Sequence, residues 1–147
     1  MRILSVANKF DTSTANLMAE YGKRLRGKFN LTTVQIKPQK GSQSQAIKQE
    51  SELLLKNIKP GEFIILLDET GEQMNSPGFS KLVSSQAQTV VFIVGGAYGV
   101  SDELKSRADL VLSLSLMVLP HRLAMIVLLE QIYRAQTIYD GHPYHHS

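Results

Sequence analysis

A glycine-rich turn directly after a strongly apolar stretch is the first candidate for a ligand site. Residues 89–94 are all β-branched or aromatic, a pattern typical of a strand buried on both faces of a parallel sheet. Gly95, Gly96 and Gly99 follow at once. Glycine lets the backbone approach either a ligand or another segment closely, so both alternatives stay open. The spacing differs from the dinucleotide fingerprint G-x-G-x-x-G, because Ala97 stands at its second glycine.

Three histidines near the end of the chain form a second group that could do chemistry. His142, His145 and His146 are close enough in sequence to suggest metal ligands. No adjacent carboxylate or cysteine completes the set, and a terminal tail is poorly preorganised for a metal. We therefore predict that the protein has no metal site.

Two classes of protein whose strands and helices also alternate fit this sequence poorly. Asp68, after another apolar stretch, could accept a phosphoryl group as in receiver domains. Those domains also need an acidic pair after the first strand, where this chain has Asn8 and Lys9. A serine hydrolase of the α/β class is disfavoured because the chain has no G-x-S-x-G elbow.

The elements that must position these residues alternate between strands and helices. Apolar and β-branched stretches predict five strands, at residues 2–7, 33–36, 63–67, 89–94 and 109–114. Capping residues and i, i+4 spacing predict helices at about residues 12–28, 44–59 and 77–83, a short one after Ser101, and one at 122–139. The fold class is therefore α/β, with a mostly parallel five-stranded sheet flanked by helices. A chain of 147 residues suits one domain, residues 1–147.

Two connecting segments and the last helix have unusual compositions. Residues 68–72 are expected to form a turn at a strand's carboxyl end, where open α/β sheets bind ligands, and Ser76 is expected to cap the next helix. Residues 115–120 are apolar, so either the protein's own backbone or the flat face of a ligand must cover them. The last helix begins apolar all round, which predicts burial in the interior or against a partner subunit.

The composition fits a reducing compartment, and the distribution of charge leaves two interpretations open. Residues 1–40 hold eight Lys and Arg residues against two acidic ones, a local charge of +6 within a total of +3. Such a basic face suits a polyanion such as nucleic acid, although a solvated helix face with cations at its carboxyl end explains the pattern equally well. The chain has no cysteine, no apolar run long enough to cross a bilayer and no secretory signal at its start. We expect a soluble cytoplasmic protein without membrane contacts.

Four stretches in the second half of the chain resemble, in order, those of one known family, and the similarity runs over essentially the whole chain. They are residues 91–99, residues 112–121, the stretch Glu130–Ala135 and the tail His142–His145. Together they resemble the ribosomal RNA large subunit methyltransferase H family of SPOUT methyltransferases. The resemblance implies an S-adenosylmethionine-dependent enzyme that methylates N3 of a pseudouridine in a 23S rRNA stem-loop at the subunit interface of assembled ribosomes. It also implies a homodimer and a C-terminal trefoil knot, a topology that connection rules disfavour.

The resemblance also implies which residues bind the methyl donor. In the family the loops of the knot hold S-adenosylmethionine, with apolar side chains around the adenine and backbone groups at its edge. The implied donor-binding residues are Leu67, Gly95, Gly96, Leu114, Ser115, Leu116, Met117, Val118 and Leu119. His121 is expected to shape this loop by hydrogen bonding.

The tail is the part that the resemblance implies for the chemical step. The acceptor nitrogen must lose a proton, so a base, or a cation that stabilises the anion, would help. The implied catalytic residues are His145 as first choice, with Tyr144, Arg134 and His146. In related knotted enzymes the partner subunit completes the site, so the tail is expected to act on the donor of the other protomer.

Two departures and one alternative accompany the resemblance. Family members commonly have lysine or arginine where His146 stands, which weakens an anion contact there at neutral pH. Many also have lysine where this chain has Glu72, which puts substrate contacts from that turn in doubt. The alternative is a non-catalytic RNA- or ribosome-binding α/β protein. The basic first third of the chain fits that alternative, but such a protein would need neither the apolar loop nor the terminal histidines.

Overall fold

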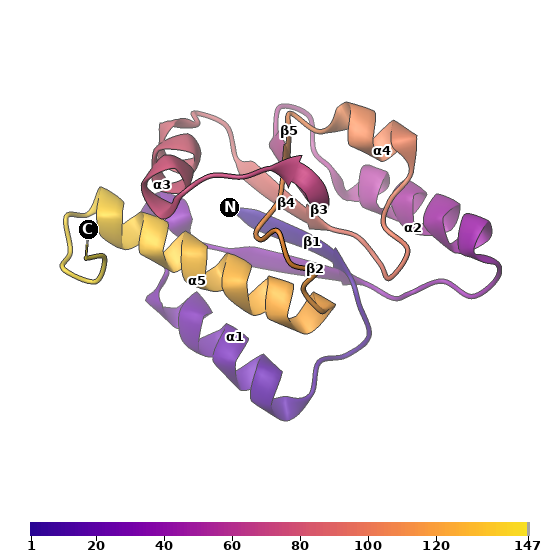
Figure 1. Cartoon of the computed structure of the whole chain (residues 1–147), viewed down its shortest axis with the longest axis horizontal. Coiled ribbons are helices and arrows are strands. Elements are labelled where there is room, and N and C mark those ends of the chain that lie inside the picture. The colour runs from indigo at the N-terminus through magenta and orange to yellow at the C-terminus, as the bar shows by residue number, and fades with distance from the viewer. Residues whose placement is uncertain (147) are drawn as a thin grey trace.

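A twisted sheet of five parallel strands forms the middle layer of the protein (Figure 1). The structure is a computed structural model and describes residues 1–146, so Ser147, the last residue of the predicted single domain, lies outside the described residues. In chain order the strands are β1 (Arg2–Val6), β2 (Thr32–Ile36), β3 (Phe63–Glu72), β4 (Val90–Val94) and β5 (Leu110–Leu112). In space their order is β2-β1-β4-β3-β5. The predicted five-stranded parallel sheet is confirmed.

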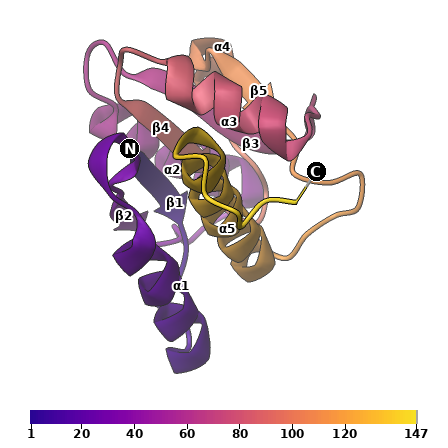
Figure 2. The same ribbon diagram turned by 90° about the vertical axis from the view of Figure 1, so that its left-hand side faces the viewer.

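Helices cover both faces of the sheet, as the predicted fold class requires. One face carries α1 (Thr12–Arg24), α3 (Ser76–Ser85) and α5 (His121–Tyr139), with α5 between the other two (Figure 2). The short 3-10 helix η1 (Gly27–Phe29) follows α1. The opposite face carries α2 (Gln43–Asn57) and α4 (Asp102–Arg107).

Strand β4 lies at the centre of the sheet and supplies side chains to two separate cores. All five of its residues are buried, as the unbroken apolar stretch predicted. Phe92 packs in the core under α3 and α5, whereas Val91 and Ile93 pack in the core under α2 and α4. Each such side chain contributes roughly 1.5–3 kcal/mol by leaving water. The site at the end of β4 is therefore built on the most deeply buried strand.

The first helix ends four residues before its predicted end at about residue 28. Leu25 leaves helical geometry, with φ −77° and ψ 136°, and its N–H bonds to the Gly22 carbonyl. Gly27 has a positive φ of 59°, which a right-handed helix does not allow, and Leu25 and Phe29 are buried in the core beside α5. The prediction that Ser76 caps α3 is also wrong by one residue. The cap is Asn75, whose Oδ1 accepts the Gly78 N–H at 2.9 Å.

Strand β3 continues through residues 68–72, where the sequence predicted a turn. Leu67 and Glu72 both lie opposite Leu112, so residues 68–71 bulge out of the pairing with β5, and the Ser113 N–H donates to the Glu72 carbonyl at 2.9 Å. A Cβ on Gly71 would lie 2.7 Å from the backbone of Val111. The prediction that this strand ends at Leu67 is therefore wrong, since β3 extends to Glu72, and Gly71 lets two backbones pass in contact. The trefoil knot stays a prediction.

Candidate functional site

A cavity of about 750 Å³ opens at the carboxyl ends of β3, β4 and β5. Ligands of open α/β sheets bind at this edge. Its walls come from the end of β3, the turn after β4, the segment between β5 and α5, and the first turn of α5. Eight of the nine predicted donor-binding residues line it: Leu67, Gly95, Gly96, Leu114, Ser115, Met117, Val118 and Leu119. Leu116 is outside the lining, with 91% of its surface exposed.

The glycine turn after β4 is packed against the chain itself on its outer side. A Cβ on Gly95 would lie 2.8 Å from Val100 Cγ1, and one on Gly96 would lie 2.4 Å from Glu50 Oε2. The Gly99 N–H donates to the Gly96 carbonyl at 3.1 Å and closes the turn. Close approach to another segment thus accounts for two of the glycines, and the same turn also forms a wall of the cavity.

The apolar segment before α5 lies open instead of being covered by the protein's own backbone. Met117 and Val118 are 75% and 77% exposed. Ser115 ties the segment together, since its Oγ accepts the Met117 N–H and its carbonyl accepts the Ser113 hydroxyl, both at 2.9 Å. The other backbone groups of residues 114–119 make no hydrogen bond within residues 1–146. The segment therefore offers apolar side chains and free backbone groups together.

His121 is fixed at the wall of this cavity and stays neutral. Its ring stacks on Phe10, with 6.1 Å between centroids, and its Nε2 is buried without a hydrogen-bond partner among the described residues. Burial lowers the pKa of His121 below its usual value, and the nearby backbone of Gly95 opposes this only in part. An uncharged ring at neutral pH suits the loop-shaping position expected from the sequence.

An ion pair that sequence reasoning missed stands on the other side of the cavity. Asp68 Oδ2 lies 2.9 Å from Lys105 Nζ, and the Thr70 hydroxyl and N–H donate to Asp68 Oδ1. Desolvation raises the pKa of Asp68, but the Thr70 hydrogen bonds and Lys105 outweigh it and hold the pKa at about 2. The position of Asp68 after an apolar stretch signalled this site, whereas nothing in the sequence linked Lys105 to it.

The C-terminal tail folds back on the last turns of α5 and forms a second polar cluster. The Tyr144 hydroxyl donates to Glu130 Oε1 at 3.2 Å, and its ring packs edge-on against Tyr133. Arg134 donates from Nη2 to the same carboxylate oxygen at 2.6 Å and lies over the Tyr144 ring. His145 Nδ1 lies 3.3 Å from Arg134 Nη1. His146 is exposed beyond this cluster.

The chemistry of the tail cluster follows from its charges. Desolvation and the Glu130 carboxylate raise the pKa of Tyr144, so the phenol keeps its proton at neutral pH. The Glu130 hydrogen bond raises the pKa of Arg134. A guanidinium has only donors, so in its contact with Arg134 the Nδ1 of His145 accepts. The neutral ring then carries its proton on Nε2 and can donate there. The cluster is suited to hydrogen-bond an anion.

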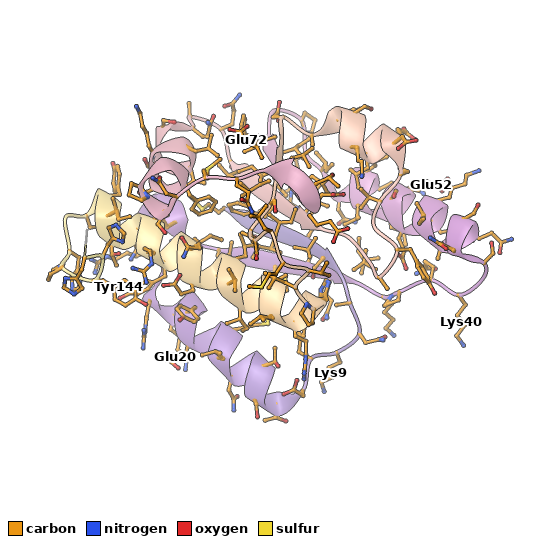
Figure 3. All side chains as sticks on the ribbon, in the orientation of Figure 1. Lys9, Glu20, Lys40, Glu52, Glu72 and Tyr144 are labelled. Atoms are coloured by element: carbon orange, nitrogen blue, oxygen red, sulfur yellow. The ribbon has the colours of Figure 1, made fainter. Side chains whose placement is uncertain are left out.

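The cavity and the tail cluster lie at opposite ends of α5 (Figure 1). His121 begins the helix at the cavity, whereas Arg134 stands thirteen residues later, about 20 Å along the axis. Tyr144, from the tail cluster, is labelled in Figure 3 at the end of the molecule away from the β5–α5 connection. The structure thus brings together eight of the predicted donor-binding residues, and separately Arg134, Tyr144 and His145, but does not join the two groups within one chain.

The part of the chain that the structure describes holds neither a cluster of metal ligands nor a helix that could span a membrane. Within residues 1–146 no three His, Cys, Asp or Glu side chains are grouped so that they could hold a metal ion. The three tail histidines do not form such a group. None of the described helices combines the length and apolar character needed to span a membrane.

Comparisons with known proteins settle which family has these features. Residues 1–145 match the family described as "Predicted SPOUT methyltransferase". The ribosomal RNA large subunit methyltransferase H of Pelobacter propionicus is 38% identical over 151 residues, covering 99% of this chain and 99% of that protein. The chain belongs to this family. The protein of the same name from Dictyoglomus thermophilum is 42% identical over 147 residues, covering 96% and 94%. The resemblance found in the sequence is confirmed.

One solved methyltransferase structure also matches this chain. The SpoU methyltransferase AviRb from Streptomyces viridochromogenes, in complex with the cofactor AdoMet, matches with a TM-score of 0.48 and 10% identity. The match covers 92% of this chain and 57% of that chain.

The cavity fits S-adenosylmethionine, the methyl donor of the family, in size and chemistry. Its volume falls within the range of roughly 300–1,000 Å³ that small-ligand sites occupy. Leu67, Met117 and Leu119 offer apolar surface for an adenine ring, and the unpaired backbone groups of residues 114–119 can hydrogen-bond its edge. Gly95 and Gly96 of the glycine turn line the cavity without a side chain of their own.

Proposed function

We propose that the protein methylates N3 of a pseudouridine in 23S rRNA of assembled ribosomes, with S-adenosylmethionine as donor. It does so in the cytoplasm, as a homodimer of single SPOUT methyltransferase domains, each formed by residues 1–147. One observation carries the proposal: the segments that the family resemblance assigned to the donor line one cavity at the ligand-binding edge of the sheet. Membership of the methyltransferase H family supports the choice of acceptor.

The donor pocket acts by orientation more than by side-chain chemistry. When bound, S-adenosylmethionine supplies a methyl group activated by a sulfonium. Gly95, Gly96 and the segment 114–119 hold the donor so that this methyl faces the acceptor nitrogen. Alignment alone is worth effective molarities on the order of 10⁵ M or more. His121 and Ser115 keep the walls of the pocket in place.

The tail residues act on the acceptor. N3 forms its bond to the methyl carbon as the carbon–sulfur bond breaks, and the N3 proton has to leave to a base or to water. Arg134 and His145 stabilise the N3 anion, the first by charge and the second by donating from Nε2, which the contact at Nδ1 favours. Tyr144 holds Arg134 from its ring face. His146, exposed at the end of the described chain, meets the RNA.

The separation of pocket and tail supports a site made by two protomers. Reacting atoms must approach to about 3–3.5 Å, whereas about 20 Å of helix lies between His121 and Arg134. The tail of one protomer therefore completes the donor pocket of the other. The exposed apolar side chains Leu116, Met117 and Val118 fit a surface that a second chain and the donor cover together.

The basic end of α1 lies beside the tail and fits an RNA backbone there. Arg24 lies over the Tyr133 ring and pairs with Glu20, and Arg26 pairs with Asp140 at 3.3 Å. Lys23 is exposed in the same last turn of α1. Several of these cations thus have partners inside the fold, yet they still concentrate positive charge next to His145 and Arg134.

The test is methyl transfer from labelled S-adenosylmethionine to ribosomes that carry the pseudouridine without its N3 methyl group. His145→Ala is compared with His142→Ala, a matched control because His142 is exposed in the same tail. Ribosomes without the pseudouridine serve as a second control. We expect incorporation only with the pseudouridine, a loss of about 10²-fold or more for His145→Ala, and near-wild-type rates for His142→Ala.

Donor binding, measured by calorimetry on the same proteins, separates the alternatives. Intact binding in His145→Ala places the loss in the chemical step. If the wild-type protein neither binds the donor nor transfers methyl, the enzyme is excluded and the non-catalytic RNA-binding alternative takes its place.

A further inference from the structure

A buried carboxylate on α2 stands directly behind the glycine turn of the cavity. Glu50 is only 4% exposed and lies on the side of α2 that also buries Ala46 and Leu54. Within residues 1–146 it makes no ion pair. A carboxylate taken out of water without a partner cation is costly, so its position calls for a compensating role.

The two oxygens of Glu50 contact two different loops at the ligand-binding edge. Oε1 accepts the Gln39 N–H at 2.9 Å, in the loop before α2. Oε2 occupies the space where a side chain on residue 96 would begin, because a Cβ built on Gly96 would lie 2.4 Å from it. One carboxylate therefore fixes the distance between the loop before α2 and the wall of the cavity.

The next residue of α2 holds the far end of the same turn. Ser51 is buried, and its Oγ accepts the Ser101 N–H at 2.8 Å. Ser101 in turn caps α4, the short helix that follows the glycine turn. Glu50 and Ser51 thus support the turn on both sides of Gly99, from a helix that contributes neither residue to the cavity lining.

We propose that Glu50 is a positioning residue for the methyl donor. Its carboxylate sets the place of Gly96, and with it the wall against which the donor lies. The inference rests on the proposed function, since it takes the cavity as the donor site. Glu50 does not touch the donor, so removing it changes donor affinity more than the rate at saturating donor.

The first experiment compares Glu50→Ala, Glu50→Gln and the control Glu52→Ala. Glu52 is exposed two residues along the same helix (Figure 3). Donor affinity is measured by calorimetry, and kcat and KM for the donor by methyl transfer. We expect Glu50→Ala to weaken affinity about tenfold and raise KM to match, because displaced supporting groups misplace a site by fractions of an ångström. Glu50→Gln keeps an acceptor for Gln39 and should restore affinity to within about threefold, and Glu52→Ala should match the wild type.

A double-mutant cycle tests the contact with Gly96 itself. Gly96→Ala drives its new methyl into Glu50 Oε2 and should weaken donor binding. In Gly96→Ala combined with Glu50→Ala the oxygen is gone, so the combined loss should be smaller than the product of the two single losses. Losses that simply multiply would overturn the inference, because the two residues would then act independently.

The outcomes are distinguishable from failure of the proposed function. A wild-type protein that does not bind the donor removes the proposed function and this inference with it. A wild-type protein that binds, with Glu50→Ala binding equally well or losing only thermal stability, overturns the inference alone. If Glu50→Ala does not fold, Glu50→Gln and Gly96→Ala still decide: affinity equal to wild type in Gly96→Ala refutes the positioning role.

Discussion

Mixing two inactive variants tests whether the active site is shared between two chains. Gly95→Val disables the pocket, because even a Cβ at this position would lie 2.8 Å from Val100 Cγ1 and a larger side chain pushes the turn into the cavity. His145→Ala disables the tail. Each variant alone should transfer almost no methyl group, the first through lost donor binding and the second through the lost chemical step.

The size of the recovery follows from dimer statistics. When equal amounts of two chains are unfolded, mixed and refolded, half of the dimers are mixed. Each mixed dimer has one site that combines the intact pocket of one chain with the intact tail of the other. Recovered activity is therefore about 25% of the wild-type value in a two-fold dimer. A site within one chain would recover nothing, since every chain carries a lesion.

The assay is methyl incorporation into ribosomes, with the dimer fraction checked by light scattering. Mixing Gly95→Val with the double variant Gly95→Val and His145→Ala is the matched control and should stay inactive. Full-length dimers without recovered activity would refute the shared site, and with it the use of the 20 Å separation along α5 as an argument for it.

Three further predictions concern stability. Leu128→Ala removes a fully buried side chain under the sheet and should lower the free energy of unfolding by about 2–5 kcal/mol in urea titrations, and a smaller change would contradict the packing described. His121 has a lowered pKa, so its contribution to folding stability is present above the ordinary histidine pKa of 6.5 and is lost as the pH falls below that value. In His121→Asn the urea midpoint should therefore change less between pH 7.5 and 5 than in the wild type. Asp68, with its pKa near 2, contributes stability above about pH 3.8 that is lost as the pH falls towards 2. The stability gap between wild type and Asp68→Asn should therefore shrink over that interval, and a constant gap would contradict the Lys105 and Thr70 contacts.

The identity of most elements was predictable because it depends on residues close together in sequence. The unbroken β-branched stretch before Gly95 became β4, buried at all five positions. Asp11 and Ser101 cap α1 and α4 through hydrogen bonds to N–H groups three residues on. Asp140 and Gly141 end α5 where predicted. In each case the partners lie within one helical turn or one strand.

The errors arose where contacts far along the chain override local preference. The i, i+4 spacing continues past Arg24, but Gly27 takes a positive φ of 59° where Leu25 and Phe29 pack beside α5, and the helix ends before it. Residues 68–72 have turn composition, yet Glu72 pairs again with β5 at Leu112 and Gly71 lies in contact with the backbone of Val111. Neither the packing beside α5 nor the contact with Val111 can be predicted from a window of neighbouring residues.

The candidate site divides in the same way. The sequence by itself, through motifs that resemble one family, indicated the residues that line the cavity and those that form the tail cluster. Only the tertiary structure placed the two groups at opposite ends of α5, joined Asp68 to Lys105, and set Glu50 behind Gly96, 46 residues away. Composition and periodicity report which side chains leave water, because burial follows local pattern. Which distant groups then meet depends on strand order and crossovers, which no local pattern encodes.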